Sequence, residues 1–126
     1  MIIDCHGHYT TAPKALEDWR NRQIAGLKDA ALTPKASELR ISDDDLRESI
    51  QSNQLKKMRE RGSDLTIFSP RASFMAHHIG DFNTSAAWAA ICNELCARVA
   101  RLFPDQGIPG LQPRKKVSGA IPVVGA

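Results

Sequence analysis

The sequence predicts an α/β fold in which helices connect two parallel strands. Two short apolar runs, near residues 2–5 and 64–69, have the composition of strands that are buried on both faces. The chain between them has the apolar spacing of helices. A strand, a helical connection and a second strand form the repeating unit of a parallel sheet. We therefore expect those two strands, together with helices near residues 13–26, 43–61 and 84–103.

The first strand leads into His6-Gly7-His8. Side chains at i and i+2 of a strand lie on one face, so both imidazoles can converge on a single ion. Gly7 allows the backbone to bend there, and Zn²⁺ readily accepts neutral imidazole as a ligand. The same spacing also fits two exposed histidines in a frayed terminus, and an ion would need one or two more ligands. By strand alternation, Cys5 points away from the histidines and into the core.

The first expected helix follows Thr10-Thr11-Ala12-Pro13, which offers capping hydroxyls and a proline near the first helical position. Trp19 lies on its apolar face, and we interpret it as a packing residue rather than a platform for substrate stacking. Residues 28–41 contain Pro34 and have little periodicity, which predicts a loop. Loops of this length often bind ligands or close over them.

Ser42-Asp43-Asp44-Asp45 begins the second expected helix. Ser42 is suited to cap it, and the three carboxylates lie where the helix dipole is positive. The triplet could also be taken for a metal cluster, but cap and dipole chemistry explains it more simply. Leu46, Ile50 and Met58 form the apolar stripe, and Gly62 suits the position after the helix end.

Pro70 closes the second strand, and residues 71–82 then lie at its carboxyl end, where barrel enzymes place their chemistry. Arg71 could bind a substrate carboxylate through two guanidinium nitrogens, or could be an exposed arginine on a turn. His77 and His78 are adjacent, so their side chains diverge and one at most faces a site. His77 is the candidate substrate contact, and a structural or solvent-facing histidine is the alternative.

The clearest helical period in the chain runs through Trp88, Ile91, Leu95, Val99 and Leu102. Asn83 or Thr84 is expected to cap this helix, and Pro104 to end it. Cys92 and Cys96 lie one turn apart on it. We interpret them as small buried hydrophobic residues rather than metal ligands, because the helix supplies no further ligand.

Charge and cysteine content exclude several classes of partner. Three of the 17 Lys and Arg lie at 114–116, and the remaining 14 balance the 14 Asp and Glu, so the net charge of +3 does not indicate a nucleic-acid-binding face. Three cysteines, an odd number, argue against a disulfide framework. Since no secretory signal precedes Asp4 and no apolar run is long enough to cross a bilayer, we expect a cytoplasmic protein without membrane partners.

The composition changes after Asp105. Residues 106–126 hold four of the eight glycines and three of the seven prolines, and no acidic residue. We therefore divide the chain into a domain at 1–105 and a Gly/Pro-rich basic tail at 106–126. The tail is expected to be disordered or only loosely attached to the domain.

Several of these segments carry a family resemblance. Asp4-x-His6-x-His8 at the end of a first strand resembles the metal motif of the amidohydrolase superfamily, whose members are zinc-dependent (β/α)₈ barrels. Three longer segments, at 6–13, 69–73 and 75–82, are similar to the decarboxylase/hydratase branch of that superfamily, and within it to the 4-oxalomesaconate hydratases. The resemblance covers Met1 to about Asp105.

The resemblance implies an incomplete fold, namely the N-terminal portion of a TIM (β/α)₈ barrel, because 126 residues are well short of the roughly 250 of a barrel. It implies that His6 and His8 bind Zn²⁺, with Asp4 supporting the strand end, and that Arg71 and His77 contact a small polycarboxylate. The further metal ligands and the acid/base group would lie on later strands. The family would place its next strand in the tail, and Gly107-Ile108-Pro109-Gly110 does not resemble one, so the resemblance implies a truncation or a shifted reading frame. The chain is therefore expected to be inactive alone. The full-length protein that the resemblance implies is a candidate homo-oligomer.

The function implied is the addition of water to an unsaturated polycarboxylate in aromatic-acid degradation. Two alternatives stay open. One is a metal-dependent decarboxylase of the same branch, since Arg71 suits the anionic substrates of both. The other is a small self-contained α/β binding domain, which would need residues 106–126 to form a third strand.

Overall fold

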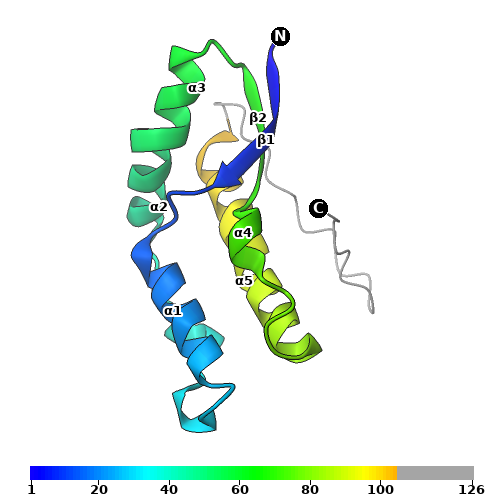
Figure 1. Ribbon diagram of the computed structural model, residues 1–126. Helices are drawn as coiled ribbons and strands as arrows, with labels where there is room; N and C mark the ends of the chain where they lie inside the picture. The colour runs from blue at the N-terminus through cyan, green and yellow to red at the C-terminus, as the bar shows by residue number, and fades with distance from the viewer. Residues whose placement is uncertain (105–126) are drawn as a thin grey trace.

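The computed structural model describes residues 1–104 (Figure 1). The predicted tail at 106–126 lies outside the described residues. Two parallel strands lie beside a set of helices, as the sequence predicts. The elements in chain order are β1 (Ile3–Tyr9), α1 (Lys14–Ala25), η1 (Ala30–Leu32), η2 (Ala36–Glu38), α2 (Asp43–Ser49), η3 (Ile50–Leu55), α3 (Lys56–Glu60), β2 (Leu65–Pro70), α4 (Ala72–Met75) and α5 (Phe82–Leu102).

Strand β1 is longer than predicted. It pairs with β2 from Ile3 opposite Leu65 to Tyr9 opposite Pro70, so both histidines lie inside the strand rather than beyond its end. The register shifts between Asp4 and Gly7, where β1 has one residue more than β2. Such a bulge interrupts the regular alternation of side chains. The expectation for Cys5 rested on that alternation and is wrong, because Cys5 is exposed.

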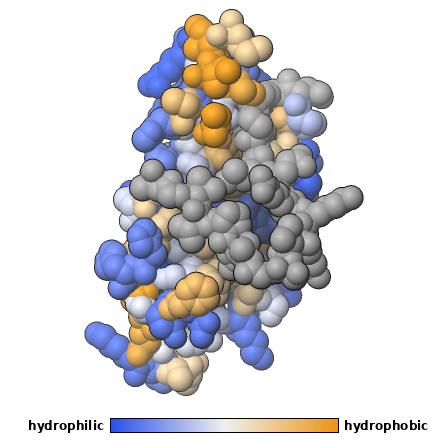
Figure 2. All heavy atoms as spheres, turned by 90° about the vertical axis from the view of Figure 1, so that its right-hand side faces the viewer, coloured by the Kyte–Doolittle hydropathy of each residue, from blue (hydrophilic) through white to orange (hydrophobic). Residues whose placement is uncertain are grey.

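The expectation that both strands are buried on two faces holds only near their carboxyl ends. Ile3 and Ile67 are 49% and 47% exposed, whereas Tyr9 and Phe68 are 4% and 1% exposed. The physical reason is that the described sheet has two strands, so much of its surface has no neighbouring strand or helix. In Figure 2, apolar atoms accordingly gather on the surface at the end of the molecule where β1 begins.

The core lies between the helices and the carboxyl half of the sheet. Trp19 on α1 stacks on Trp88 on α5, with ring centroids 6.2 Å apart and planes 10° from parallel. Trp19 is therefore a packing residue, as predicted. The helical stripes read from the sequence are buried or partly buried, and so are the cysteines on α5. The buried cluster comprises Tyr9, Leu16, Trp19, Ile41, Leu46, Ile50, Leu55, Phe68, Trp88, Cys92, Leu95, Cys96, Val99 and Phe103.

Helix ends agree with the prediction in part. Ser42 caps α2, since its side chain accepts a hydrogen bond from the Asp45 backbone N–H, and Gly62 has a positive φ of 66°.

The other two helix caps were predicted wrongly. Pro13 precedes α1, and no side chain caps this helix, because the Thr11 hydroxyl donates to the Ser49 carbonyl oxygen instead. Asp81, and not Asn83 or Thr84, caps α5. Its carboxylate accepts a hydrogen bond from the free backbone N–H of Thr84.

The predicted helix at 43–61 is interrupted by a π-helical segment. Helices α2 and α3 flank η3, whose six residues are wound as a π-helix. Periodicity of apolar residues does not distinguish one wide turn within a longer helix, so the π-helical segment could not be predicted from the apolar pattern. Among residues 1–104, no helix is long and apolar enough to cross a membrane.

Candidate metal centre

His6 and His8 converge at the carboxyl half of β1. Their Nε2 atoms lie 3.0 Å apart, and the two rings meet edge to face with centroids 4.5 Å apart. Two nitrogen ligands of a tetrahedral zinc ion, each about 2.0–2.1 Å from the metal, would be about 3.3 Å from each other. The pair therefore fits two neighbouring positions of such an ion with only a small adjustment of the rings.

Contacts from β2 orient the His8 ring. Its Nδ1 lies 3.0 Å from the carbonyl oxygen of Pro70 and 2.9 Å from Ser69 Oγ. A carbonyl oxygen can only accept, so Nδ1 carries the proton and the lone pair is on Nε2. Ser69 in turn donates its hydroxyl proton to the Gly7 carbonyl oxygen at 3.1 Å. This is the tautomer that a metal-ligating histidine needs, with its second nitrogen donating to a backbone carbonyl.

His6 is more exposed than His8 and lies within the bulge in β1. Since His8 Nε2 carries a lone pair, the 3.0 Å contact requires His6 Nε2 to be the donor when the pair is free of metal. Asp4 accepts the His6 backbone N–H at 2.9 Å and so supports the strand at the bulge. A supporting rather than a ligating role for Asp4 in a metal site stays a prediction.

Gly7 is required by close approach and not by backbone bending. A Cβ added to Gly7 would lie 2.2 Å from Thr66 Cγ2 and 2.9 Å from the Ile67 carbonyl oxygen. Any larger residue would therefore push β1 away from β2, and with it the His8 ring from Ser69 and Pro70. The sequence correctly marks this glycine, but the reason for it is the neighbouring strand.

The segment that follows the histidines is held by groups that no sequence pattern predicted. Tyr9 is buried, and its hydroxyl is hydrogen-bonded to Ser49 Oγ. Burial raises the pKa of Tyr9 to about 12, so this residue is a neutral anchor. Gln54 on η3 donates from Nε2 to the His8 carbonyl oxygen at 3.1 Å. No motif or spacing marks these partners, because they lie 40 or more residues away in the chain.

Arg71 is adjacent in sequence to a residue that contacts His8. It directly follows Pro70, whose carbonyl oxygen contacts His8, and its exposed side chain donates from Nε to Ser73 Oγ at 3.1 Å. Arg71 also lines an apolar hollow of about 30 Å³ between β1, α4 and α5. That volume accommodates about one water molecule, so the hollow is no substrate pocket. The guanidinium is available to an anion approaching from solvent.

The structure does not place His77 with the pair. His77 is exposed on the turn between α4 and α5, and its carbonyl oxygen accepts the hydroxyl of Ser85 at 3.0 Å. Helix α4 leads away from the end of β2 and separates this turn from Arg71 (Figure 1). His78 is exposed on the same turn.

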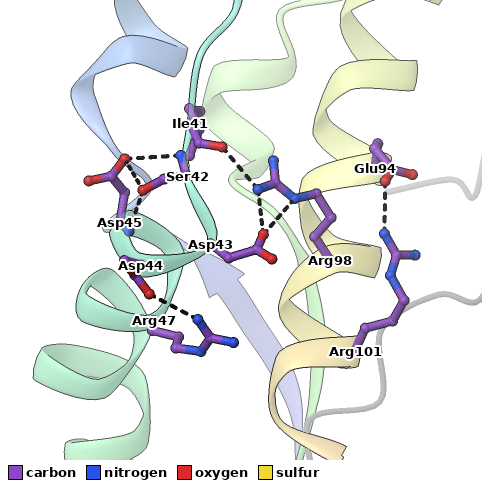
Figure 3. Close-up of polar contacts among 9 residues, drawn as sticks. All are labelled: Ile41, Ser42, Asp43, Asp44, Asp45, Arg47, Glu94, Arg98 and Arg101. Carbon is purple, nitrogen blue, oxygen red and sulfur yellow. Dashed lines mark hydrogen bonds and ion pairs between the residues drawn. The ribbon is translucent and has the colours of Figure 1, made fainter.

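The acidic triplet of α2 has structural roles (Figure 3). Asp43 binds Arg98 on α5 at 2.6 Å, Asp44 pairs with Arg47 at 3.0 Å, and Asp45 bonds back to Ser42. The hydrogen bond from Arg98 lowers the pKa of Asp43, and the bonds from Ser42 lower the pKa of Asp45. Within residues 1–104, no group of three or more His, Cys, Asp or Glu side chains is arranged to hold a metal ion.

A fold of two parallel strands with a histidine pair at their carboxyl ends is the arrangement expected of an amidohydrolase. The Amidohydrolase family model matches residues 3–111, and the chain belongs to this family. The strands and helices match an N-terminal piece of a TIM-barrel amidohydrolase, which confirms the predicted fold class.

Two relatives are themselves hydratases. The chain is 55% identical over 105 residues to 2-keto-4-carboxy-3-hexenedioate hydratase of Sphingobium sp. (strain NBRC 103272 / SYK-6), covering 83% of this chain and 30% of the relative. It is also similar to the crystal structure of 4-oxalomesaconate hydratase LigJ from Rhodopseudomonas palustris, with 72% sequence identity and a TM-score of 0.78. That match covers 86% of this chain and 31% of the solved one. The chain thus spans less than a third of the length of either relative.

Proposed function

We propose that this chain forms the N-terminal part of a metal-dependent hydratase that adds water to an unsaturated polycarboxylate such as 4-oxalomesaconate. The observation that supports it most is the convergence of the His6 and His8 Nε2 atoms, 3.0 Å apart, with His8 held in the ligating tautomer. The likeness to two hydratases of this kind supports the substrate class.

In this proposal His6 and His8 hold a divalent ion, for which zinc is the best candidate because it accepts imidazole nitrogen readily. When bound, such an ion polarises a substrate oxygen and stabilises negative charge as it develops. Arg71 binds a carboxylate remote from the reacting carbons through two guanidinium nitrogens. His77 is the weaker candidate for a second substrate contact, because only its place in the chain and not its surroundings suggests that role.

Residues 1–104 place two protein ligands together, whereas catalytic zinc sites use three. We therefore propose that the 126-residue chain binds zinc weakly and does not hydrate 4-oxalomesaconate by itself. The remaining ligands and the group that moves the proton would come from the part of the family's barrel that this chain does not match. A cytoplasmic location is part of the same proposal, as expected for an enzyme of small-molecule degradation.

The metal role can be tested by calorimetry with zinc. The chain should bind one zinc ion weakly, and His6→Ala and His8→Ala should each abolish the signal. His78→Ala is the matched control, because His78 is exposed and lies on the turn between α4 and α5. Binding that survives both substitutions at 6 and 8 would reject these residues as ligands.

The activity can be tested in a chimera. Residues 1–104 of this chain would replace the matching part of LigJ, to which it is 72% identical, and loss of the conjugated substrate would be followed by absorbance. We expect an active chimera that His8→Ala inactivates and His78→Ala does not. Release of carbon dioxide without hydration would favour the decarboxylase alternative, and an active His8→Ala chimera would refute the proposed metal chemistry.

A further inference from the structure

Gln54 joins the π-helical segment η3 to the end of β1. Its Nε2 donates to the His8 carbonyl oxygen at 3.1 Å, and its Oε1 accepts the Thr11 hydroxyl at 2.7 Å. Nε2 also lies 3.5 Å from Thr10 Oγ1. One amide side chain therefore contacts three of the four residues from His8 to Thr11.

The π-helical winding explains why Gln54 is turned toward β1. Ile50 and Leu55 are five residues apart and are 0% and 1% exposed, respectively. On an α-helix, residues that share a face are three or four apart, whereas π-helical bonding joins residues five apart. The extra residue in the turn lets both apolar side chains enter the core while the neighbouring Gln54 faces the strand end. π-helical turns occur frequently at functional sites.

A second pair of contacts ties the end of β1 to Ser49, the last residue of α2. The Thr11 hydroxyl also approaches the Ser49 carbonyl oxygen at 3.1 Å, and the Tyr9 hydroxyl is hydrogen-bonded to Ser49 Oγ. The His8 carbonyl oxygen accepts the Thr10 backbone N–H at 2.8 Å in addition to Gln54. The turn that ends β1 is thus fixed from one side by the last residue of α2 and by the end of η3.

We propose that Gln54 is a positioning residue for His8: through the His8 carbonyl oxygen it fixes the strand end from which the imidazole reaches the ion. This inference rests on the proposed metal role of His8. Partners that orient a ligating histidine commonly contribute 10- to 100-fold to metal affinity. Gln54 would act on the same residue through its backbone, while Pro70 and Ser69 act on its ring.

Gln54→Met tests the proposal, because methionine has a similar length and neither donor nor acceptor of comparable strength. We expect zinc affinity, measured by calorimetry well below the unfolding temperature, to fall by about 10-fold. Gln51→Met is the matched control, since Gln51 is an exposed glutamine of the same π-helical segment. Equal zinc affinity in both variants would overturn the proposal.

Thr11→Val provides a milder variant that removes the hydroxyl bound by Gln54. It should weaken zinc binding in the same direction. Combined with Gln54→Met it should add little, because both changes break one connected network. Fully additive losses of affinity would contradict a shared network and overturn the proposal.

A metal-free measurement separates this inference from the metal role itself. The Thr10 amide, which donates to the His8 carbonyl oxygen, should exchange with solvent several-fold faster in Gln54→Met than in Gln51→Met. If the unsubstituted chain binds no zinc, the metal role fails while faster exchange still supports Gln54 as the group that fixes the strand end. Unchanged exchange would overturn the positioning role whatever the zinc result.

Discussion

The guanidinium carbon of Arg20 lies 5.1 Å from the centroid of the Trp88 ring. These two side chains, from α1 and α5, bind three successive carbonyl oxygens at the end of α4. Trp88 Nε1 donates to Phe74, and Arg20 Nη2 lies 3.2 Å from the carbonyl oxygens of both Met75 and Ala76. The short α4 and its left-handed end at Ala76, with φ of 40°, are therefore held from inside the core.

Arg20→Met should destabilise the chain by about 2–3 kcal/mol, because hydrogen bonds to a charged donor are lost and two carbonyl groups lose their partner. Arg20 is 1% exposed, so water cannot replace it without rearrangement. Urea unfolding followed by tryptophan fluorescence measures the loss. Arg22→Met is the control: its ion pair with Glu38 is exposed, so the change should cost less than about 1 kcal/mol. Equal losses in the two variants would contradict the assignment.

Gly7→Ala should cost about 2–3 kcal/mol, near the upper end of the range for forced overpacking, because the new Cβ would meet Thr66 Cγ2 and the Ile67 carbonyl oxygen. Gly62→Ala is the comparison, since it has φ of +66° but open space around it and should cost about 1 kcal/mol. Thr66→Ser should recover part of the Gly7→Ala loss in urea unfolding. A Gly7→Ala chain as stable as Gly62→Ala would refute the close approach of the strands.

One thiol of three should react in the folded chain. Cys5 is exposed, whereas burial raises the pKa values of Cys92 and Cys96 to about 12. Titration with an aromatic disulfide reagent at pH 8 should therefore give one fast equivalent, and three after unfolding in urea. Cys5→Ser should remove the fast equivalent. Rapid reaction of two or three thiols in the native chain would mean that α5 is not packed as described.

Acidification should weaken the link between α2 and α5. The hydrogen bond from Arg98 lowers the pKa of Asp43 below its ordinary value of 3.8, so the charged carboxylate is favoured by folding. The stabilisation is fully present above about pH 5 and is lost as pH falls through 3.8 and below. Arg98→Met should reduce the slope of stability against pH in this range. Arg101→Met, which removes the exposed pair with Glu94, should leave most of it. Equal slopes in Arg98→Met and in the unsubstituted chain would contradict the assignment.

Local sequence signals predicted the parts of the fold that local chemistry determines. Periodicity located α1 and α5, and Ser42 and Gly62 marked helix ends because their own backbone and side-chain preferences decide those positions. The histidine pair was found for the same reason, since its two members are separated by one residue. The role of that pair as metal ligands remains a prediction.

Features that depend on distant partners were not predicted. The bulge in β1 arises from its register against β2, and it placed Cys5 on the surface. The support of the strand end by Gln54 depends on a π-helical turn 46 residues away from His8. Pairwise contacts of this kind leave no pattern in a single sequence, and they determine how firmly the histidines are held.

The parallel pairing of β1 with β2 also has a consequence for how the chain folds. The contacts that orient His8, to Ser69 and Pro70, join residues 61 and 62 positions apart. Closing a loop of about 60 residues costs on the order of 4 kcal/mol of chain entropy, whereas helical turns form from neighbours. The helices between the strands can therefore form early and shorten the distance to be closed. We therefore expect the histidine pair to gain its orientation late in folding, when the two strands meet.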